Sequence, residues 1–390
     1  MESIRLTKQE AREYMMSYHM INTNDHLEGM DGVHAVFDRL LSIQYDPLNV
    51  VGTNLELVLQ SRISKFNKKL LNQALYQERF LIDAWDKQMC VYQTKDFPLL
   101  EKIRNHRGEL EIHTLKHRLQ LDALEYIEIV LKEIRDKGPI YAKDINIGES
   151  IKHQWGQTKP SSATLDYLFQ IGKIGVFNKK NTMKQYDLIE RLIDNCEFKV
   201  GFQDEDAFIE YYLLRRIKSM GLVSNKNGVH FSGLFINNKE IRTKYLKKLI
   251  QKEIVAEIEI EELKGKYYVL TDYLKSSSKV IKSVSFIAPL DNMIWDRSIL
   301  KDLFDYEYTW EVYTPKSKQR FGYYVLPILY GTQFIGRIEF EQQRNSNPLR
   351  IKNIWYEDYF NQSKEFEIAF DKALMKFSKY LCAETFIKDN

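Results

Sequence analysis

The sequence predicts an α+β fold in which small helical domains with strand hairpins precede a C-terminal β-rich domain. Two observations predict it. An order of helix, helix and hairpin occurs twice between residues 122 and 270, and short strand-like segments dominate after residue 280. Helices followed by a basic hairpin are the pattern of tandem winged-helix (helix-turn-helix) domains. The 390 residues are enough for several cores, and the expected domains are 1–120, 121–200, 201–275 and 276–390.

The first domain should begin with two helices. Thr7 and Glu10 have the spacing of a capping box, which predicts a helix reaching about Ile21. A second helix is expected over residues 32–43. A proline disfavours the helical conformation in the residue before it, and Pro47 follows Asp46. Residues 44–46 should therefore lie just past a helix end or at the start of a strand.

The next two domains are predicted from alternating helical and strand patterns. The expected helices are 122–137, 161–171 with Ser161 as its N-cap, 206–220 and 239–251. The expected strands are 173–178, 184–188, 254–262 and 266–270. Lys179 and Lys180 occupy the turn of the first hairpin.

The C-terminal domain changes character after a run of three serines. Its expected strands are 280–288, 306–313, 322–330 and 334–340. A last helix is expected over residues 364–381. This segment is therefore predicted as a β-rich domain with one terminal helix.

Composition excludes several classes of protein. Its 57 Lys and Arg nearly balance 54 Asp and Glu, and 44% of the residues are hydrophobic, so the chain is globular and neither disordered nor fibrous. No apolar run approaches the ~18 residues of a membrane span, and the N-terminus has no apolar signal core, which predicts a cytoplasmic protein. Cys90, Cys196 and Cys382 lie far apart without a CxxC pair, which supports neither a disulfide framework nor a zinc site.

The positive charge is gathered in strips. Residues 62–69 and 173–184 each hold four basic residues and no acid, and residues 239–252 hold six basic residues and one Glu. Separate basic strips are compatible with nucleic acid that follows several small modules. Solvated helix faces would give the same pattern, and composition alone favours that simpler interpretation.

Gln44 and Asp46 are candidates for catalysis. In an extended segment, side chains at i and i+2 point to the same side, so this amide and this carboxylate could face one small volume while Tyr45 points into the core. The Gln can only orient a water, whereas the Asp can accept a proton or stabilise a developing cation. Both properties suit an oxocarbenium-like transition state. An Asp-Pro turn beside a surface Gln is the alternative, and spacing alone favours it.

A second candidate surface is the basic segment with Lys316, Lys318 and Arg320. It is expected as a hairpin tip between two strands, flanked by aromatic residues, that could enter a groove or stack on a base. An ordinary solvated hairpin is the alternative. His113 and His117 are spaced i, i+4, but no acid lies between them, so the zinc-protease pattern is absent and no metal is expected.

With these pieces together, the sequence resembles the AlkZ/YcaQ family of bacterial winged-helix DNA glycosylases. Residues 40–51 resemble the catalytic Gln-x-Gln or Gln-x-Asp segment of that family. Residues 81–85 resemble the helical piece that follows it. The most specific segment is 287–297, Ile-Ala-Pro-Leu-Asp-Asn-Met-Ile-Trp-Asp-Arg. The other matching segments are 164–174, 313–315 and 321–327.

The resemblance implies three tandem winged helices and a β-domain that form a C-shaped clamp on duplex DNA. It implies monofunctional hydrolysis of the N-glycosidic bond of N7-alkylated purines, and in some members the unhooking of interstrand crosslinks, without metal or cofactor. Gln44 would hold the attacking water, and Asp46 would assist as base or electrostatic partner. The DNA-binding residues would be Lys316, Lys318, Arg320, Lys87, Lys179 and Lys180.

Two positions bear on the substrate. Many family members have a His where this chain has Lys87, and Asp46 places the chain with the Gln-x-Asp branch, which resembles the broader crosslink-repair type. A monomer acting on duplex DNA is expected. The alternative is a non-catalytic winged-helix regulator, which would bind a specific DNA site whether or not a lesion is present.

Overall fold

The computed structural model describes residues 4–145, 147, 151–153, 156–180, 182–193, 201–274, 278–343 and 348–388. By its internal contacts the chain divides into two compact units, one made of Met1–Leu71 with Asp206–Asn390 and the other of Asn72–Glu205. The expected fold class, α+β, is confirmed. The finer division into four domains stays a prediction.

The N-terminal part of the first unit is helical. Its elements are α1 (Lys8–His19), α2 (Gly29–Leu40), the short strand β2 (Ser42–Gln44), α3 (Asn54–Arg62) and α4 (Lys68–Asn72). The capping box predicted at Thr7 and Glu10 is present and starts α1. The second helix ends earlier than expected, because Leu41 has a positive φ of 60° and turns the chain into β2.

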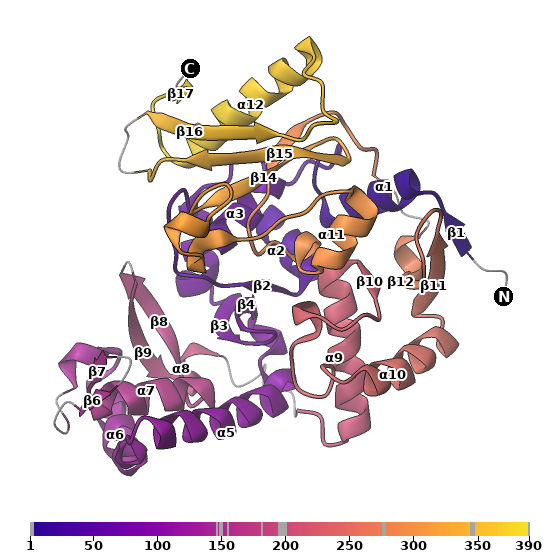
Figure 1. Cartoon of the computed structure of the whole chain (residues 1–390). Helices are drawn as coiled ribbons and strands as arrows, with labels where there is room; N and C mark the ends of the chain where they lie inside the picture. Colours follow the sequence, from indigo (N-terminus) through magenta and orange to yellow (C-terminus); the bar gives the residue numbers. More distant parts are fainter. Residues whose placement is uncertain are drawn as a thin grey trace. The chain divides into compact units, whose positions relative to one another are not determined.

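A four-stranded sheet continues this unit. Its order is β1 (Ile4–Leu6), β11 (Val255–Ile260), β12 (Tyr267–Leu270) and β10 (Leu222–Ser224), beside helices α9 (Glu205–Met220) and α10 (Lys239–Gln251). Both helices and the β11–β12 hairpin agree with prediction. The N-terminal strand β1, which pairs in parallel with β11, was not predicted, since three residues are too few for a periodic pattern (Figure 1).

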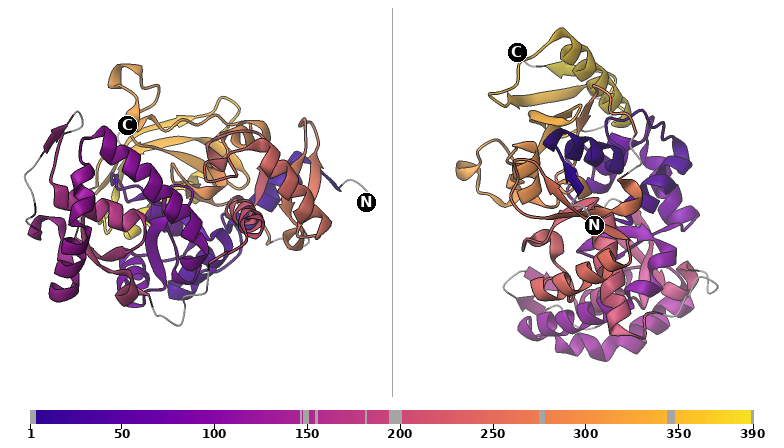
Figure 2. Two further views of the ribbon diagram at one scale, coloured as in Figure 1. Left: turned by 90° about the horizontal axis from the view of Figure 1, so that it is seen from below. Right: turned by 90° about the vertical axis from the view of Figure 1, so that its right-hand side faces the viewer.

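The C-terminal part of this unit is a curled five-stranded sheet with α11 (Arg297–Phe304) before its second strand. Helix α12 (Lys364–Tyr380) lies along one face, where Phe370 and Phe377 pack edge-on against Phe286 (Figures 1 and 2). The five strands, in spatial order, are β13 (Val284–Phe286), β14 (Val325–Tyr330), β15 (Gln333–Phe340), β16 (Leu349–Tyr356) and β17 (Phe386–Lys388).

The strand predicted over residues 306–313 is wrong. This segment is irregular, although Tyr306 and Tyr308 alternate as in a strand. Their buried hydroxyls donate to the carbonyl oxygens of Gly336 at 2.9 Å and Val325 at 2.7 Å. The alternation therefore reflects side chains that pack onto the sheet and does not reflect backbone pairing.

The second unit begins with a helical turn, Gln73–Gln77, which precedes a hairpin of β3 (Leu81–Trp85) and β4 (Met89–Gln93). The helical piece expected at residues 81–85 is thus wrong. Each residue of β3 has an antiparallel partner in β4, from Leu81 opposite Gln93 to Trp85 opposite Met89. This pairing satisfies the backbone groups of a segment too short to be stable as an isolated helix.

The rest of the second unit combines helices with a three-stranded sheet of order β5–β9–β8. A buried apolar cluster joins its helices to the sheet, and Leu168 and Val130 are fully buried within it.

Ser161 was expected to cap a helix, but the helix begins one residue earlier, with Pro160 in its first turn. The Ser161 hydroxyl instead donates to the Ile145 carbonyl at 3.3 Å. The elements are α5 (Glu101–His117), α6 (Ile127–Lys137), β5 (Ile140–Tyr141), β6 (Ile151–His153), β7 (Gly156–Thr158), α7 (Pro160–Gln170), β8 (Ile174–Lys180), β9 (Met183–Leu188) and α8 (Ile189–Leu192).

Two further observations concern the described residues only. None of their helices has both the length and the apolar sequence required to cross a bilayer. Cys90 is buried and Cys382 is exposed, and neither forms a disulfide within the described ranges, while Cys196 lies outside them.

Candidate active site

Gln44 and Asp46 lie where a short strand ends. Gln44 is the last residue of β2, and Asp46 follows in a segment without regular secondary structure. One carboxylate oxygen of Asp46 accepts a hydrogen bond from the Leu48 N–H at 2.8 Å, which makes a local turn around Pro47. Tyr45 is only half-buried and does not enter the core as expected, because the strand has ended before it. The Asp46 carboxylate is thus fixed by a backbone hydrogen bond just after the end of β2.

Two buried asparagines fix the backbone of β2. The side-chain NH₂ of Asn54 donates to the Gln44 backbone carbonyl at 2.8 Å. The side-chain oxygen of Asn54 accepts the Leu290 N–H at 2.9 Å. Asn292 donates to the Ser42 carbonyl at 2.8 Å. Because the side chains that fix β2 are themselves held by the core, the strand that carries Gln44 has little freedom to move.

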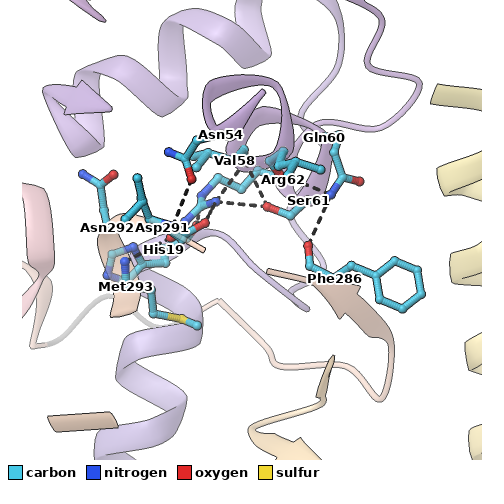
Figure 3. A network of polar contacts seen from close by, with 12 residues as sticks. His19, Asn54, Val58, Gln60, Ser61, Arg62, Phe286, Asp291, Asn292 and Met293 are labelled. Atoms are coloured by element: carbon cyan, nitrogen blue, oxygen red, sulfur yellow. Dashed lines mark hydrogen bonds and ion pairs between the residues drawn. The ribbon is translucent and has the colours of Figure 1, made fainter. Parts of the chain in front are cut away.

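A fully buried ion pair supports this arrangement. The Arg62 guanidinium binds Asp291 through two hydrogen bonds of 2.8 and 2.9 Å, and neither side chain is exposed (Figure 3). Arg62 also donates to the carbonyl of His19 at 2.9 Å. Burial alone would favour a neutral acid, but the Arg62 charge and its hydrogen bonds hold the pKa of Asp291 below its usual range. Asp291, one of two carboxylates in residues 287–297, therefore has a structural role.

Asp46 is not the only acid in its neighbourhood. Burial raises the pKa of Tyr324 above its usual value, and the negative charges of Asp46 and Glu56 raise it further. Glu56 caps α3 by accepting the Thr53 N–H at 2.8 Å, and it also accepts the Tyr380 hydroxyl at 3.3 Å. Both carboxylates therefore act electrostatically on the Tyr324 phenol, and the charge of Glu56 is partly offset by its ion pair with Lys68 at 3.3 Å.

The surroundings of Glu56 are tightly packed. Gly52 has a φ of +118°, and a Cβ there would lie 2.0 Å from the Tyr380 hydroxyl oxygen.

The sequence alone did not identify Glu56 or Tyr324 as part of this region. The Thr53-x-x-Glu56 capping box is a visible signal for Glu56, whereas nothing in the sequence links residue 324 to residue 46.

The basic segment of residues 316–320 is not a hairpin tip between two strands. It forms a short 3₁₀ turn, Lys316–Lys318, in the irregular connection between α11 and β14, and Lys316, Lys318 and Arg320 are all exposed. The Glu311 carboxylate accepts the N–H groups of Arg320 at 2.9 Å, Phe321 at 2.9 Å and Gly322 at 3.2 Å. Since a side chain satisfies these donors, the backbone has no need of a strand partner.

Glu311 is the organising group of this basic loop, which we define as residues 311–322. Burial of its carboxyl opposes ionisation, but the three backbone N–H donors hold the pKa of Glu311 below its usual value. Arg320 lies close enough to contribute electrostatically as well.

Replacing Glu311 by glutamine should loosen the basic loop without unfolding the protein. An amide has one acceptor oxygen, so at least one of the three N–H groups loses its partner, at a cost of about 1–3 kcal/mol. Trypsin should then cut after Lys316, Lys318 or Arg320 at least about fivefold faster under native conditions. Glu307→Gln is the matched control, since Glu307 pairs with Lys301 on the surface; equal cleavage rates in the two variants would contradict this account.

The remaining predicted DNA-binding lysines lie in the second unit. Lys87 is half-buried in the turn between β3 and β4, and Lys180 is exposed at the end of β8. Lys179 forms an ion pair with the buried carboxylate of Asp83. Asn181, in the same turn, lies outside the described residues. The DNA contacts of all three lysines stay predictions.

The basic strips seen in the sequence are neutralised by acids only in part. Lys244 and Lys248 pair with Asp206, and Lys252 pairs with Glu210. By contrast, no ion pair joins Lys316, Lys318 or Arg320 to another residue in the described ranges. The basic loop is therefore the stronger candidate for a phosphate contact in the first unit.

No three His, Cys, Asp or Glu side chains within the described ranges are grouped so that they could hold a metal ion.

The family model described as "DNA glycosylase AlkZ-like" matches residues 37–380, a range that includes Gln44, Asp46 and the basic loop. Among solved structures, the chain is similar to Streptomyces sahachiroi DNA glycosylase AlkZ with a TM-score of 0.63 and 10% sequence identity, over 99% of this chain and 100% of that one. At that identity the structural likeness concerns the fold.

Proposed function

Given that the chain belongs to the AlkZ-like DNA glycosylase family, we propose that it hydrolyses the N-glycosidic bond of N7-alkylated purines in duplex DNA. The observation that carries the proposal is the Gln44–Asp46 pair at the end of a strand whose backbone is fixed by Asn54 and Asn292. Placement of a reacting water needs such rigidity, because small displacements cost large factors in rate.

The proposed reaction follows from the charge of the lesion. Alkylation at N7 makes the purine cationic, so the base leaves as a neutral molecule and needs little acid catalysis. Gln44 orients a water, the water attacks C1′, and the C1′–N9 bond breaks with its electron pair going to the base. Asp46 accepts the proton of the water or stabilises the oxocarbenium-like sugar. The negative charge of Asp46 favours the positive charge that develops on the sugar.

The same proposal includes the finer fold. Residues 1–120, 121–200 and 201–275 would be three winged helices, and with the β-domain of residues 276–390 they would clamp duplex DNA. The β5–β9–β8 sheet with α6 and α7 supports this for the second of these domains, since a helix, a short strand, a helix and a hairpin follow in that order. We propose a monomer that acts in the cytoplasm, with interstrand crosslinks as a further substrate class.

The first experiment is release of base from a duplex that contains one N7-alkylguanine. Abasic sites are revealed by alkaline strand cleavage, with wild type beside Gln44→Ala. Wild type should release the base, and Gln44→Ala should be slower by at least about 100-fold with DNA affinity retained, because only the position of the water is lost. Wild type that binds damaged and undamaged duplex equally and releases nothing would instead support the non-catalytic DNA-binding protein.

A further inference from the structure

The basic loop displays one aromatic side chain almost completely to solvent. Tyr313 is 85% exposed, more than any other exposed large hydrophobic side chain in the described residues. Single exposed apolar residues are common and need no explanation by themselves. Three features of its surroundings distinguish Tyr313 from such residues.

The first feature is the order of the backbone on either side. The Gln319 side chain donates to the Thr314 carbonyl at 2.9 Å and to the Glu311 carbonyl at 3.3 Å. The Thr314 N–H donates to the Glu311 carbonyl at 2.8 Å. These bonds enclose Tyr313, so its ring is presented from a fixed backbone and binding would cost little additional entropy.

The second feature is charge. Lys316, Lys318 and Arg320 follow Tyr313 within the same loop, are exposed and have no acid within ion-pair distance among the described residues. Single-stranded or unstacked nucleic acid is bound by this combination, in which cations attract the phosphates and an aromatic face stacks on a base. An acidic peptide would explain the cations of the loop but would not require the exposed ring of Tyr313.

The third feature is a path of rings from Tyr313 toward the candidate site. Trp310 contacts Tyr313 edge-on, with ring centroids 6.0 Å apart, and contacts Tyr324 edge-on at 6.1 Å. The Tyr324 phenol in turn lies within electrostatic reach of Asp46. Three aromatic rings therefore connect the exposed end of the loop to the neighbourhood of the proposed catalytic carboxylate.

We propose that Tyr313 stacks on a nucleobase beside the lesion and so holds the damaged nucleotide where Gln44 and Asp46 can act on it. The inference rests on the proposed function, because it takes the DNA lesion as the substrate. The stacking contact uses the ring face, so the hydroxyl of Tyr313 is not required. Stacking also tolerates any base, since every base has a π-face.

The test measures binding and stacking without any base release. The probe is a duplex with 2-aminopurine beside a tetrahydrofuran abasic analogue, and binding of wild type should quench the 2-aminopurine fluorescence. Tyr313→Ala should lose the quenching and bind roughly 5- to 100-fold more weakly. Tyr313→Phe should behave as wild type. The salt dependence of binding should be the same for all three, because no charge changes.

The control is Tyr359→Ala, at a half-exposed tyrosine that follows β16 in the same unit. Quenching and affinity of Tyr313→Ala equal to wild type would overturn the proposal, and so would an equal loss in Tyr313→Phe or in Tyr359→Ala. Wild type that quenches the probe but releases no alkylated base would preserve the stacking contact and reject the glycosylase. Base release by wild type, with Tyr313→Ala unchanged in both assays, would reject the stacking contact alone.

Discussion

Replacing Asp46 by asparagine is expected to slow base release by roughly 10²–10⁴-fold, the range lost when a general base is removed. The amide has nearly the same size, and its oxygen can still accept the Leu48 N–H that Asp46 accepts at 2.8 Å. The local turn should therefore persist while the negative charge is lost. The rate constant for release from N7-alkylguanine duplex under single-turnover conditions measures the effect, and DNA affinity should be retained.

A charge-matched control separates catalysis from general electrostatics. Asp25 is exposed in the same unit, and Asp25→Asn removes one negative charge as well. That variant should release base at the wild-type rate. Release by Asp46→Asn within a few-fold of wild type would remove Asp46 from the mechanism and leave Gln44 as the only candidate.

Breaking the buried ion pair should cause the largest loss of stability. Arg62→Met leaves the Asp291 carboxylate buried without its partner, which typically costs about 3–5 kcal/mol. The double variant Arg62→Met/Asp291→Leu should recover much of that loss, because no charge then remains buried. Urea denaturation gives the free energies of unfolding. Arg5→Met, at an exposed pair of 3.7 Å with Glu261, should have no measurable effect.

The pH dependence of this destabilisation follows from the low pKa of Asp291. A carboxyl whose pKa is lowered in the folded state contributes stability that is fully present above its unfolded pKa of about 3.9 and is lost as the pH falls through the folded pKa. In Arg62→Met, burial without the guanidinium should raise the pKa of Asp291 above that unfolded value, so the variant regains stability by protonation as the pH falls. The difference between wild type and Arg62→Met should therefore be largest near pH 8 and shrink as the pH falls toward about 4. A difference that stays constant from pH 8 to about pH 4 would contradict the assignment of an ionised Asp291 in wild type.

Local signals made much of the fold predictable from the sequence. The capping box at Thr7, the helix of residues 239–251 and the β11–β12 hairpin depend on nearby residues, and all three are present. The errors occurred where a distant partner decides the local structure. Residues 306–313 alternate as a strand does, yet Tyr306 and Tyr308 bond to the sheet through their hydroxyls.

The candidate site was predictable only in part, for a related reason. Gln44 and Asp46 are two residues apart and could be recognised as a pair. Asp291 belongs to the most specific segment of the sequence, but only its partner Arg62 shows that its role is structural. Glu56 and Asp46 both act electrostatically on Tyr324, which lies far from them in the chain.

The two asparagines that fix β2 also determine when the site can first exist during protein synthesis. Asn292 follows Ser42 by 250 residues, so a ribosome has to make most of the chain before the strand carrying Gln44 is held from both sides. A nascent or prematurely terminated chain that lacks residue 292 therefore contains Gln44 and Asp46 with only the Asn54 contact to hold β2. Cleavage of glycosidic bonds is harmful on undamaged DNA, and this dependence confines the proposed chemistry to chains completed past that point.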